Sequence, residues 1–566
     1  PTDNFVAKIG DSVYATLKEA FDAVTDDTAT TIKLLANCSG DGIQVKGGKN
    51  ITVDFDGHTY TVDGETVGSA GTETNGFQLL AKSNITFKNG SIVSSKARIL
   101  IQSYSNLTIE NMTLDLSEQP LYGYTLSNNN GVTVINNSTI KAPLAKRSMA
   151  FDACGFANYG DTTVTLKGNS VIEGDVVFSN ESTVNSNVTL NLEGGTIKGE
   201  LSPGTGAEKV TVKKSEAVSV PAPSGYKWTT VDGVQTLVKL SYVAEVNGVK
   251  YETLQAAIDA AGRRQTVTLV SDTRENVTIA KPLTLDLNGY TLNGGTVKGK
   301  PALTVTAKGV TVKDSGTART GTIMREDTAE NSGISSYYVI DVQGVGWLTF
   351  EGGTVKNNSG IVGVKGASLV RIGDDSVAKY PGLNIKGGTF TQDNFIAIKV
   401  DRGDLFLNGG TINSANSYAI ENWFRATVKG GTVNGDAASW TYSGGANSTL
   451  EITGGTINGN VTSVNYGNAE DKKATVKITG GTVNGKLDTR SYDPTTGELT
   501  AIDDAKKAAI EVTGGTFTND PTAYLVESSS ITVENGKYSV AKAYLAKVGN
   551  TQYYTMDEAF KAQTAS

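Results

Sequence analysis

The chain contains very few residues that form disulfides or bind transition metals. Its 566 residues include one histidine, His58, and two cysteines, Cys38 and Cys154. A cysteine pair and a lone histidine cannot supply a disulfide framework or a Cys/His metal centre. We therefore expect two buried or inert thiols, and neither a metal nor a cofactor.

Charge is also scarce. Charged residues make up 19% of the chain, the formal net charge is −8, and no cluster of basic residues stands out. Such a chain is not expected to bind nucleic acid. No signal peptide, transmembrane run or sorting tail occurs, so any such signal was removed or lies outside these residues, and we expect no membrane insertion of this segment. Abundant Gly, Thr, Ser and Asn favour an exported protein that is extracellular, either at the cell surface or secreted.

A short turn sequence, Gly-Gly-Thr followed by Ile, Val or Phe, is repeated along the chain. Each copy follows a strand of alternating apolar residues. In the second half the spacings between the threonines are 35, 22, 21, 24, 26 and 34 residues, which is the period range of a solenoid. The repeated threonines are Thr196, Thr354, Thr389, Thr411, Thr432, Thr456, Thr482 and Thr516.

Each repeat has the pattern of short strands joined by tight turns. Leu450 and Ile452 alternate on one face of a strand, and Gly454 and Gly455 supply a turn before Thr456. A period of 21 residues holds about three short strands and three turns, which predicts an all-β fold of the parallel β-helix type. The two cysteines would then lie about four coils, or roughly 20 Å, apart, too far for a disulfide.

Four successive turns continue as Thr-Ile-Asn or Thr-Val-Asn. The β-branched residue is expected to fill the core while Thr and Asn face outward. Stacked coils, about 4.8 Å apart, would align the amides into a ladder along the axis. The four asparagines are Asn413, Asn434, Asn458 and Asn484.

A longer repeat divides the chain into modules. The segments that begin at Phe5, Tyr242 and Tyr544 align without a gap, and each contains a short amphipathic helix with a threonine N-cap. Such a helix can cover the open end of a β-helix. We predict module 1 over 1–241, module 2 over 242–543, and the start of a third module or a C-terminal cap over 544–566. The predicted cap helices span about 16–25 and 253–262, and Asp-Gly and Asn-Gly predict exit hairpins over about 226–239 and 530–541.

Two matching segments carry a resemblance to a known family. Residues 54–59, Asp-Phe-Asp-Gly-His-Thr, and 286–291, Asp-Leu-Asn-Gly-Tyr-Thr, follow the cap helix and first coil of each module. They resemble the opening of pectate-lyase-like right-handed parallel β-helix modules in large surface proteins of Gram-positive bacteria. The resemblance implies a right-handed β-solenoid in two tandem modules, each opened by a short amphipathic capping helix. Because that superfamily holds lyases, hydrolases, tailspikes and adhesins, the resemblance leaves the activity open.

The residues that enzymes of this fold use are poorly represented. His58 aligns with Tyr290 of the second module, which favours a turn residue over a general acid. The pairs Asp374-Asp375 and Asp503-Asp504 are adjacent residues, which face opposite sides of a strand and cannot converge. We therefore predict no catalytic residues, although a polysaccharide-active lyase or glycoside hydrolase stays an alternative, because carboxylates from different coils can meet.

A binding site is better supported. Tyr418, Trp423 and Arg425 belong to one coil, and Trp440 and Tyr442 lie about one coil further on. Aromatic rings beside a cation suit both sugars and protein partners. An equally open interpretation is that these rings fill the core or pack under a loop. The excursion over 141–159 is a second place where a loop could carry recognition.

These observations predict an extracellular, adhesin-like or scaffold segment of a bacterial surface protein. Its partner would be a glycan or a host or bacterial surface protein, and it could form a linear array or associate with itself through module ends. The final helix is predicted to cover the last coil of module 2, with Met556, Ala559 and Phe560 facing the protein. Ice binding through the outward Thr-x-Asn columns is a further alternative.

Overall fold

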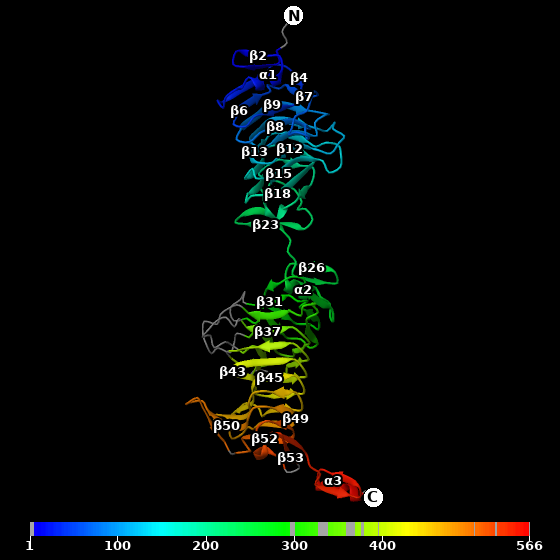
Figure 1. Ribbon diagram of the computed structural model, residues 1–566, viewed down its shortest axis with the longest axis vertical. Helices are drawn as coiled ribbons and strands as arrows, with labels where there is room; N and C mark the ends of the chain where they lie inside the picture. Colours follow the sequence, from blue (N-terminus) through cyan, green and yellow to red (C-terminus); the bar gives the residue numbers. More distant parts are fainter. Residues whose placement is uncertain are drawn as a thin grey trace. The chain divides into compact units, whose positions relative to one another are not determined.

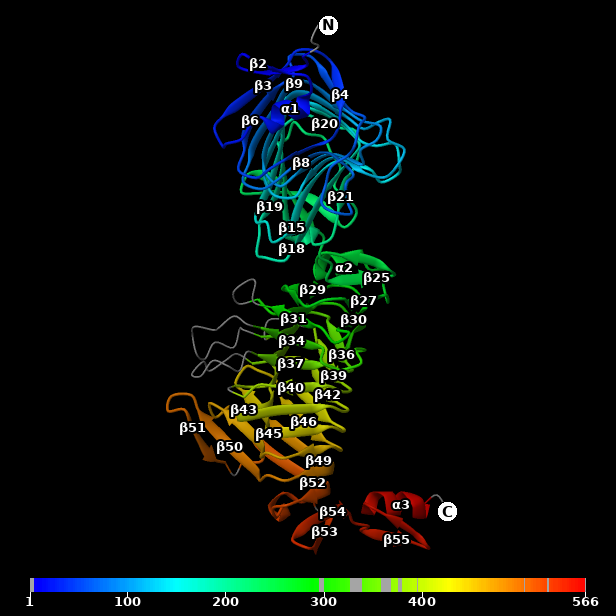
Figure 2. The same cartoon turned by 45° about the horizontal axis from the view of Figure 1, so that its top comes forward.

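The structure, a computed structural model, describes residues 5–294, 300–325, 338–357, 368–374, 379–393, 395–502, 504–526 and 529–564. It consists of β-strands in long parallel sheets, with three short α-helices among the described residues. Two compact units are present, residues 1–240 (unit 1) and 241–566 (unit 2). Figure 1 labels their elements, and Figure 2 shows them from a second direction.

Unit 1 begins with a hairpin, a helix and three columns of parallel strands. The hairpin is β1 (Ala7–Ile9) and β2 (Ser12–Tyr14), and helix α1 (Leu17–Asp22) follows it with Thr16 as its N-cap. The first column is β3 (Thr30–Leu34), β6 (Asn50–Asp54), β9 (Asn84–Val93), β11 (Asn106–Asp115), β13 (Gly131–Asn136), β16 (Thr162–Lys167), β19 (Val188–Leu192) and β22 (Val210–Lys214). The second is β4 (Cys38–Gly40), β7 (Thr59–Val62), the ends of β9 and β11, β14 (Thr139–Lys141), β17 (Val171–Glu173) and β20 (Thr196–Ile197). The third is a separate sheet of β5 (Ile43–Val45), β8 (Asn75–Leu79), β10 (Ile99–Ser103), β12 (Tyr124–Asn128), β15 (Met149–Ala157), β18 (Asp175–Ser182) and β21 (Leu201–Pro203).

Unit 2 repeats this arrangement. It begins with the hairpin β25 (Ala244–Val246) and β26 (Val249–Tyr251) and helix α2 (Leu254–Ala260). The first column is β27 (Thr266–Leu269), β30 (Thr284–Asp286), β33 (Val310–Lys313), β36 (Trp347–Phe350), β39 (Gly382–Ile385), β42 (Asp404–Leu407), β44 (Arg425–Val428), β46 (Ser448–Ile452), β49 (Ala474–Val483) and β52 (Ala508–Phe517). The second is β28 (Thr273–Arg274), β31 (Thr291–Gly294), β34 (Thr322–Arg325), β37 (Thr354–Asn357), β40 (Thr389–Thr391), β43 (Thr411–Asn422), β45 (Thr432–Tyr442), β47 (Thr456–Ile457) and the ends of β49 and β52. The third is β29 (Val277–Ile279), β32 (Leu303–Val305), β35 (Ile340–Val342), β38 (Val370–Ile372), β41 (Ile398–Val400), the ends of β43 and β45, β48 (Val461–Tyr466) and β50 (Leu487–Asp493), beside which β51 (Glu498–Ala501) runs antiparallel.

The Gly-Gly-Thr turns keep the strands in register. Thr354 to Thr516 are register partners in consecutive strands of the second column, as the repeat predicts. At one such turn a Cβ on Gly454 would lie 2.3 Å from the backbone oxygen of Lys429 in the preceding repeat. Gly455 has φ +77°, a conformation that L side chains rarely adopt. The first glycine therefore allows two backbones to approach and the second forms the turn.

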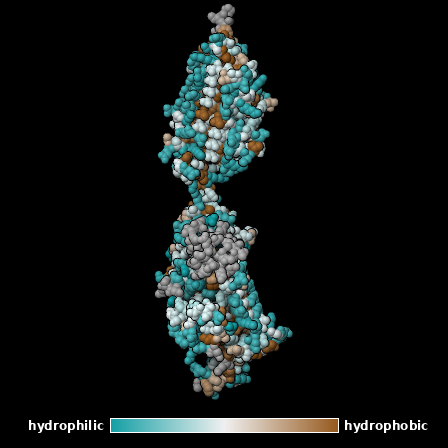
Figure 3. All heavy atoms as spheres, turned by 90° about the vertical axis from the view of Figure 1, so that its left-hand side faces the viewer, coloured by the Kyte–Doolittle hydropathy of each residue, from teal (hydrophilic) through white to brown (hydrophobic). Residues whose placement is uncertain are grey.

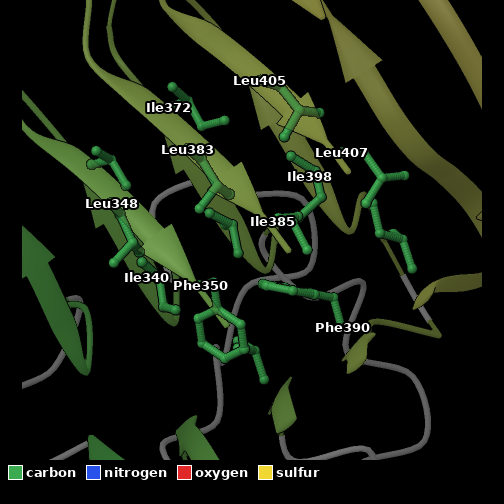
Figure 4. Packing of buried hydrophobic residues seen from close by; sticks show 14 of the residues in the cluster. Ile340, Leu348, Phe350, Ile372, Leu383, Ile385, Phe390, Ile398, Leu405 and Leu407 are labelled. Atoms are coloured by element: carbon green, nitrogen blue, oxygen red, sulfur yellow. The ribbon is translucent and has the colours of Figure 1, made fainter. Parts of the chain in front are cut away.

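The inward side chains of each unit form their own hydrophobic core. Figure 4 shows part of the core of unit 2, where Leu348, Leu383 and Leu405 come from successive strands of one column and stack above one another. Phe350 and Phe390 add a tilted ring pair with centroids 4.8 Å apart. Hydrophilic side chains predominate on the face shown in Figure 3. The burial of one residue in two along the strands agrees with the alternating sequence pattern.

The predicted asparagine ladder is present on the outer surface of unit 2. The Nδ2 groups of Asn434, Asn458 and Asn484 each donate to Oδ1 of the preceding asparagine, at 2.8, 2.6 and 2.7 Å. Asn413 donates to the hydroxyl of Thr391, and Thr518 donates to Oδ1 of Asn484. Every amide in the ladder donates toward the N-terminal repeat.

Each set of columns is followed by an antiparallel hairpin. In unit 1, β23 (Tyr226–Val231) and β24 (Val234–Lys239) turn at Asp232-Gly233, and β24 pairs with β22. In unit 2, β53 (Ser529–Glu534) and β54 (Lys537–Lys542) turn at Asn535-Gly536, and β54 pairs with β52.

The C-terminal segment does not pack as predicted. It forms a hairpin, β55 (Ala546–Val548) and β56 (Thr551–Tyr553), on which helix α3 (Met556–Thr564) packs. Ala559 is buried, but Met556 and Phe560 are 53% and 59% exposed. The prediction that all three side chains face the protein is therefore wrong for two of them. The equivalent positions Leu254 and Ile258 of α2 are buried, because α2 also packs on the first strands that follow it, β27 and β29.

Candidate functional site

The structure brings four of the five predicted binding residues together on the outer side of unit 2. The rings of Trp423 and Trp440 stack with centroids 5.3 Å apart, and Tyr418 and Tyr442 meet them edge-on at 5.7 Å. Tyr466 and Tyr492, which the sequence analysis did not single out, complete this Trp423 cluster. Tyr442, Tyr466 and Tyr492 are register partners in three adjacent strands, so the cluster is a product of strand stacking.

Most of the ring surface in this cluster is used for packing. Trp440 is only 6% exposed and Trp423 is half-buried. The indole Nε1 of Trp423 donates to Oε1 of Glu421 at 2.8 Å, and burial raises the pKa of that carboxyl. Tyr418 is also enclosed, and burial raises its pKa to about 12. The cluster therefore resembles a small hydrophobic core outside the main one more than an open stacking platform.

Arg425 belongs to a different group. Its guanidinium lies over the rings of Phe424 and Tyr380, at 4.6 and 5.3 Å from their centroids, and Nε forms an ion pair with Asp404 at 2.6 Å. Tyr380 and Phe424 are stacked with parallel planes, 5.1 Å apart. Strand β44 begins at Arg425, directly after the corner that holds Trp423 and Phe424, so neighbouring residues in the sequence join separate clusters.

The candidate catalytic residues that the structure describes, His58, Asp374 and Asp504, lie in turns and loops. His58 is a turn residue whose backbone NH donates to Phe55, as its alignment with Tyr290 predicts. Asp504 lies in a loop, where its carboxylate accepts from the backbone NH of Lys506, and Asp375 and Asp503 lie outside the described residues. Within the residues that the structure describes, no group of three or more His, Cys, Asp or Glu side chains could hold a metal. Cys38 and Cys154 are free thiols.

One row of charged side chains crosses the third column of unit 2. Asp341, Arg371, Lys399 and Glu421 are register partners in successive strands. Arg371 forms two hydrogen bonds with Asp341, at 3.0 and 2.7 Å, and Lys399 forms an ion pair with Asp401 at 3.1 Å. Asp341 and Glu421 are buried. Each charged group in this row therefore has a polar partner, within the row or beside it, which suits a structural role.

An open groove that the sequence analysis did not predict lies on the third column of unit 1. Its volume is about 510 Å³, and we call it the tyrosine groove. It is lined by Ser69, Thr72, Thr74, Asn75, Arg98, Ile99, Gln102, Tyr104, Tyr122, Gly123, Tyr124, Phe156 and Tyr159. The lining comes from strands β8, β10, β12 and β15, the loop before β8, and the residues next to these strands.

Five aromatic rings line the tyrosine groove. Tyr104 and Tyr159 lie 4.7 Å apart, and Phe156 is stacked parallel to Tyr159 at 6.5 Å. Tyr122 and Tyr124 meet edge-on at 5.8 Å, and their hydroxyls share a 3.0 Å hydrogen bond. Tyr159 is 47% exposed, so it presents ring surface to solvent. Parallel strands with rings at their ends form a rigid support for planar ligands.

Hydrogen-bonded amide side chains, of which Asn75 and Gln78 are buried, hold the floor of the groove. Oε1 of Gln102 accepts hydrogen bonds from Asn75 at 2.9 Å and from Gln78 at 3.0 Å, and Gln44 donates to Gln78 at 2.6 Å. This chain of amides follows one register column of β5, β8 and β10. Because both partners of Gln102 donate to its oxygen, the orientation of its amide group is fixed.

A buried carboxylate lies in the same column two strands further. Asp152 on β15 accepts from the backbone NH of Asn128 at 2.5 Å and from the hydroxyl of Ser127 at 3.1 Å. Burial raises the pKa of Asp152 to about 7, and it also raises the pKa of Tyr104 and Tyr124 nearby. Burial raises the pKa of the adjacent thiol of Cys154 to about 11, in agreement with an inert cysteine.

Part of the groove lies in the excursion over 141–159 that was singled out as a place for recognition. Phe156 and Tyr159 line the groove, whereas Phe151 is fully buried in the core. The other signal in the sequence was the tyrosines of Ser103-Tyr104-Ser105 and Tyr122-Gly123-Tyr124, where large rings are flanked by serine or glycine.

Comparisons with protein-family models, with curated proteins and with solved structures find no match to this chain. Among the described residues, no helix is both long and apolar enough to span a membrane. The function is therefore inferred from the geometry of the chain itself.

Proposed function

We propose that the chain is an extracellular, adhesin-like segment of a bacterial surface protein that binds a glycan. The tyrosine groove is the observation that carries this proposal. It combines exposed aromatic faces, which stack on sugar rings, with amide groups that can hydrogen-bond sugar hydroxyls. In the charged row of unit 2, Arg371 is paired with Asp341 and Lys399 with Asp401, which disfavours catalysis by a lyase or hydrolase.

In this proposal each unit is a right-handed parallel β-helix module with a scaffold role. The three parallel columns and their constant register support a closed solenoid. Helices α1 and α2 would cover its first coil, since Leu17 and Leu254 are buried against the strands that follow each helix. The Trp423 cluster would then stiffen the outer side of module 2, with Tyr442 and its register partners as a second, weaker surface for a protein partner.

The C-terminal segment supports a linear array. It repeats the hairpin and helix that open units 1 and 2, but its apolar face, with Met556 and Phe560, is exposed. In unit 2, β25 pairs with β27 of the following column, whereas β55 pairs with β56 alone among the described strands. We infer that this segment opens another module in the intact protein, or associates with a module end of another copy.

The test is a glycan and protein array with the purified chain, beside lyase and reducing-end assays on polyuronides. We expect glycan binding that Tyr159→Ala weakens about tenfold, through loss of one stacking ring, and no cleavage. Matched variants are Tyr159→Phe, which keeps the ring, and Trp423→Ala, which removes a ring from the other cluster. Cleavage products, or glycan binding that depends on Trp423 and not on Tyr159, would contradict the proposal.

A further inference from the structure

Arg98 is held at the edge of the tyrosine groove by its own backbone and side chain. Its Nε donates to the backbone oxygen of Tyr122 at 3.0 Å, and its backbone oxygen accepts from the NH of Tyr124 at 2.9 Å. A Cβ on Gly123 would lie 1.9 Å from the oxygen of Arg98, so only glycine allows the two strands to pass this closely. The guanidinium is therefore fixed through Nε to the backbone of Tyr122 at the edge of the groove.

The charge of Arg98 is not balanced within the groove. Arg98 is the one charged residue among those that line it, and its side chain is exposed. Among the described residues no carboxylate forms an ion pair with it, in contrast to Arg371 and Arg425 of unit 2. The terminal nitrogens Nη1 and Nη2 are thus available to a ligand. A guanidinium fork matches a carboxylate, with which it forms two parallel hydrogen bonds.

A second donor lies within the lining. Gln102 uses Oε1 for the hydrogen bonds from Asn75 and Gln78, which leaves the two hydrogens of its Nε2 without a protein acceptor in the described part of the chain. The amide of Gln102 and the guanidinium of Arg98 are therefore both donors toward the groove. A ligand that uses both groups must present oxygen acceptors, and one that also uses the rings must present flat apolar faces.

We propose that the tyrosine groove binds an oligosaccharide that carries a carboxylate, and that Arg98 recognises this carboxylate. This inference rests on the proposed function and names the ligand class of the same site. The sugar rings stack on Tyr104, Tyr159 and Phe156, while Gln102 donates to a hydroxyl or ring oxygen. The positive edge of the groove selects acidic sugars, although the chain as a whole has a net charge of −8.

The experiment compares acidic and neutral probes of the same size by titration calorimetry. One pair is a hexuronate tetramer and its methyl ester, and the other is a sialylated trisaccharide and its methyl ester. We expect the acidic member of at least one pair to bind about tenfold more tightly than the neutral member, with a preference that weakens as salt is added. The pair that shows the preference identifies the source of the carboxylate as uronate or sialate.

Variants separate this inference from the proposed function. Arg98→Gln should lower the affinity for the acidic probe to that for the neutral probe, and Arg98→Lys should keep part of the preference for the acidic probe. Tyr159→Ala should weaken both probes about tenfold, whereas Tyr159→Phe should weaken neither. Arg263→Gln removes the same charge from an exposed site in unit 2 and should change nothing. Hydrogen exchange of β10 and β12 verifies that each variant is folded.

Two results would overturn the inference in different ways. Equal affinity for the acid and its neutral partner, or a preference that survives in Arg98→Gln, rules out recognition by Arg98 but leaves glycan binding in place. Binding of no glycan, with capture of a protein partner that Tyr159→Ala does not affect, contradicts both the inference and the proposed function.

Discussion

Replacing Asp152 with asparagine should stabilise unit 1 by an amount that increases with pH. The carboxyl is 5% exposed, and burial raises its pKa from the ordinary 3.8 to about 7. Between these two values the folded chain retains a proton that the unfolded chain releases. The free energy of unfolding of the natural protein therefore falls as pH rises through this window.

The magnitude follows from the size of the shift. Each pKa unit corresponds to about 1.4 kcal/mol, so a shift of about three units costs about 4 kcal/mol once the pH exceeds 7. About 3 kcal/mol of this cost is added between pH 5 and pH 8. Asparagine keeps an oxygen that can accept from the NH of Asn128 and carries no charge. The advantage of Asp152→Asn over the natural chain should thus grow by about 3 kcal/mol across this interval.

Hydrogen-exchange mass spectrometry of β12 and β15 in graded urea, at pH 5 and pH 8, measures this difference where it arises. Asp63→Asn is the control, because Asp63 is an exposed carboxylate in the same unit. Its effect on the free energy of opening should stay within about 0.5 kcal/mol at both pH values. If natural unit 1 becomes more stable from pH 5 to pH 8, or if the advantage of Asp152→Asn is independent of pH, the burial argument is refuted.

Three further predictions concern the scaffold. Asn458→Ala removes two hydrogen bonds of the ladder and should lower the free energy of unfolding of unit 2 by roughly 1–2 kcal/mol in urea titrations. Asn447→Ala, outside the ladder, is the control. An equal loss of stability in both variants would show that the ladder contributes nothing specific. Gly455→Ala places a Cβ 2.8 Å from the oxygen of Gly430 at φ +77° and should lower the free energy of unfolding by about 1–3 kcal/mol. Gly444→Ala, at a similar φ in open space, should lower it less. The reverse order would contradict the role given to the close approach. Because burial raises the pKa of both thiols, Cys38 and Cys154 should react with a thiol reagent at pH 8 far more slowly than a free cysteine does. Cys154 should react more slowly than Cys38. Rapid labelling of both thiols would refute this.

The strand register could be predicted from the sequence because its causes are local. In the Gly-Gly-Thr turns of unit 2 the second glycine has a positive φ, so these letters mark the same position in each of these repeats, and the asparagines align once the threonines do. The amphipathic segments of α1 and α2 were equally visible, as their buried leucines show.

The candidate sites depend on contacts that the sequence does not specify. A stacking role for Trp440 would need an exposed ring face, but Tyr492, 52 residues later, packs against its ring at 5.7 Å and helps to bury it. The tyrosine groove combines residues from 69 to 159, and its shape depends on the loop before β8 and on a register shift between Met149 and Phe151. Neither a loop path nor a bulge follows from periodicity.

The single direction of strand stacking in unit 2 has a mechanical consequence. The chain enters this sheet at β25 and leaves it at β54, with 28 strands between them. A pull on the two ends therefore loads the rows of hydrogen bonds one after another rather than all at once. Each row that opens releases the length of chain in one repeat, and one hydrogen bond of the asparagine ladder opens with it. Tension is limited to the strength of a single row, so the unit lengthens in small steps and absorbs work before the rest of the chain is strained.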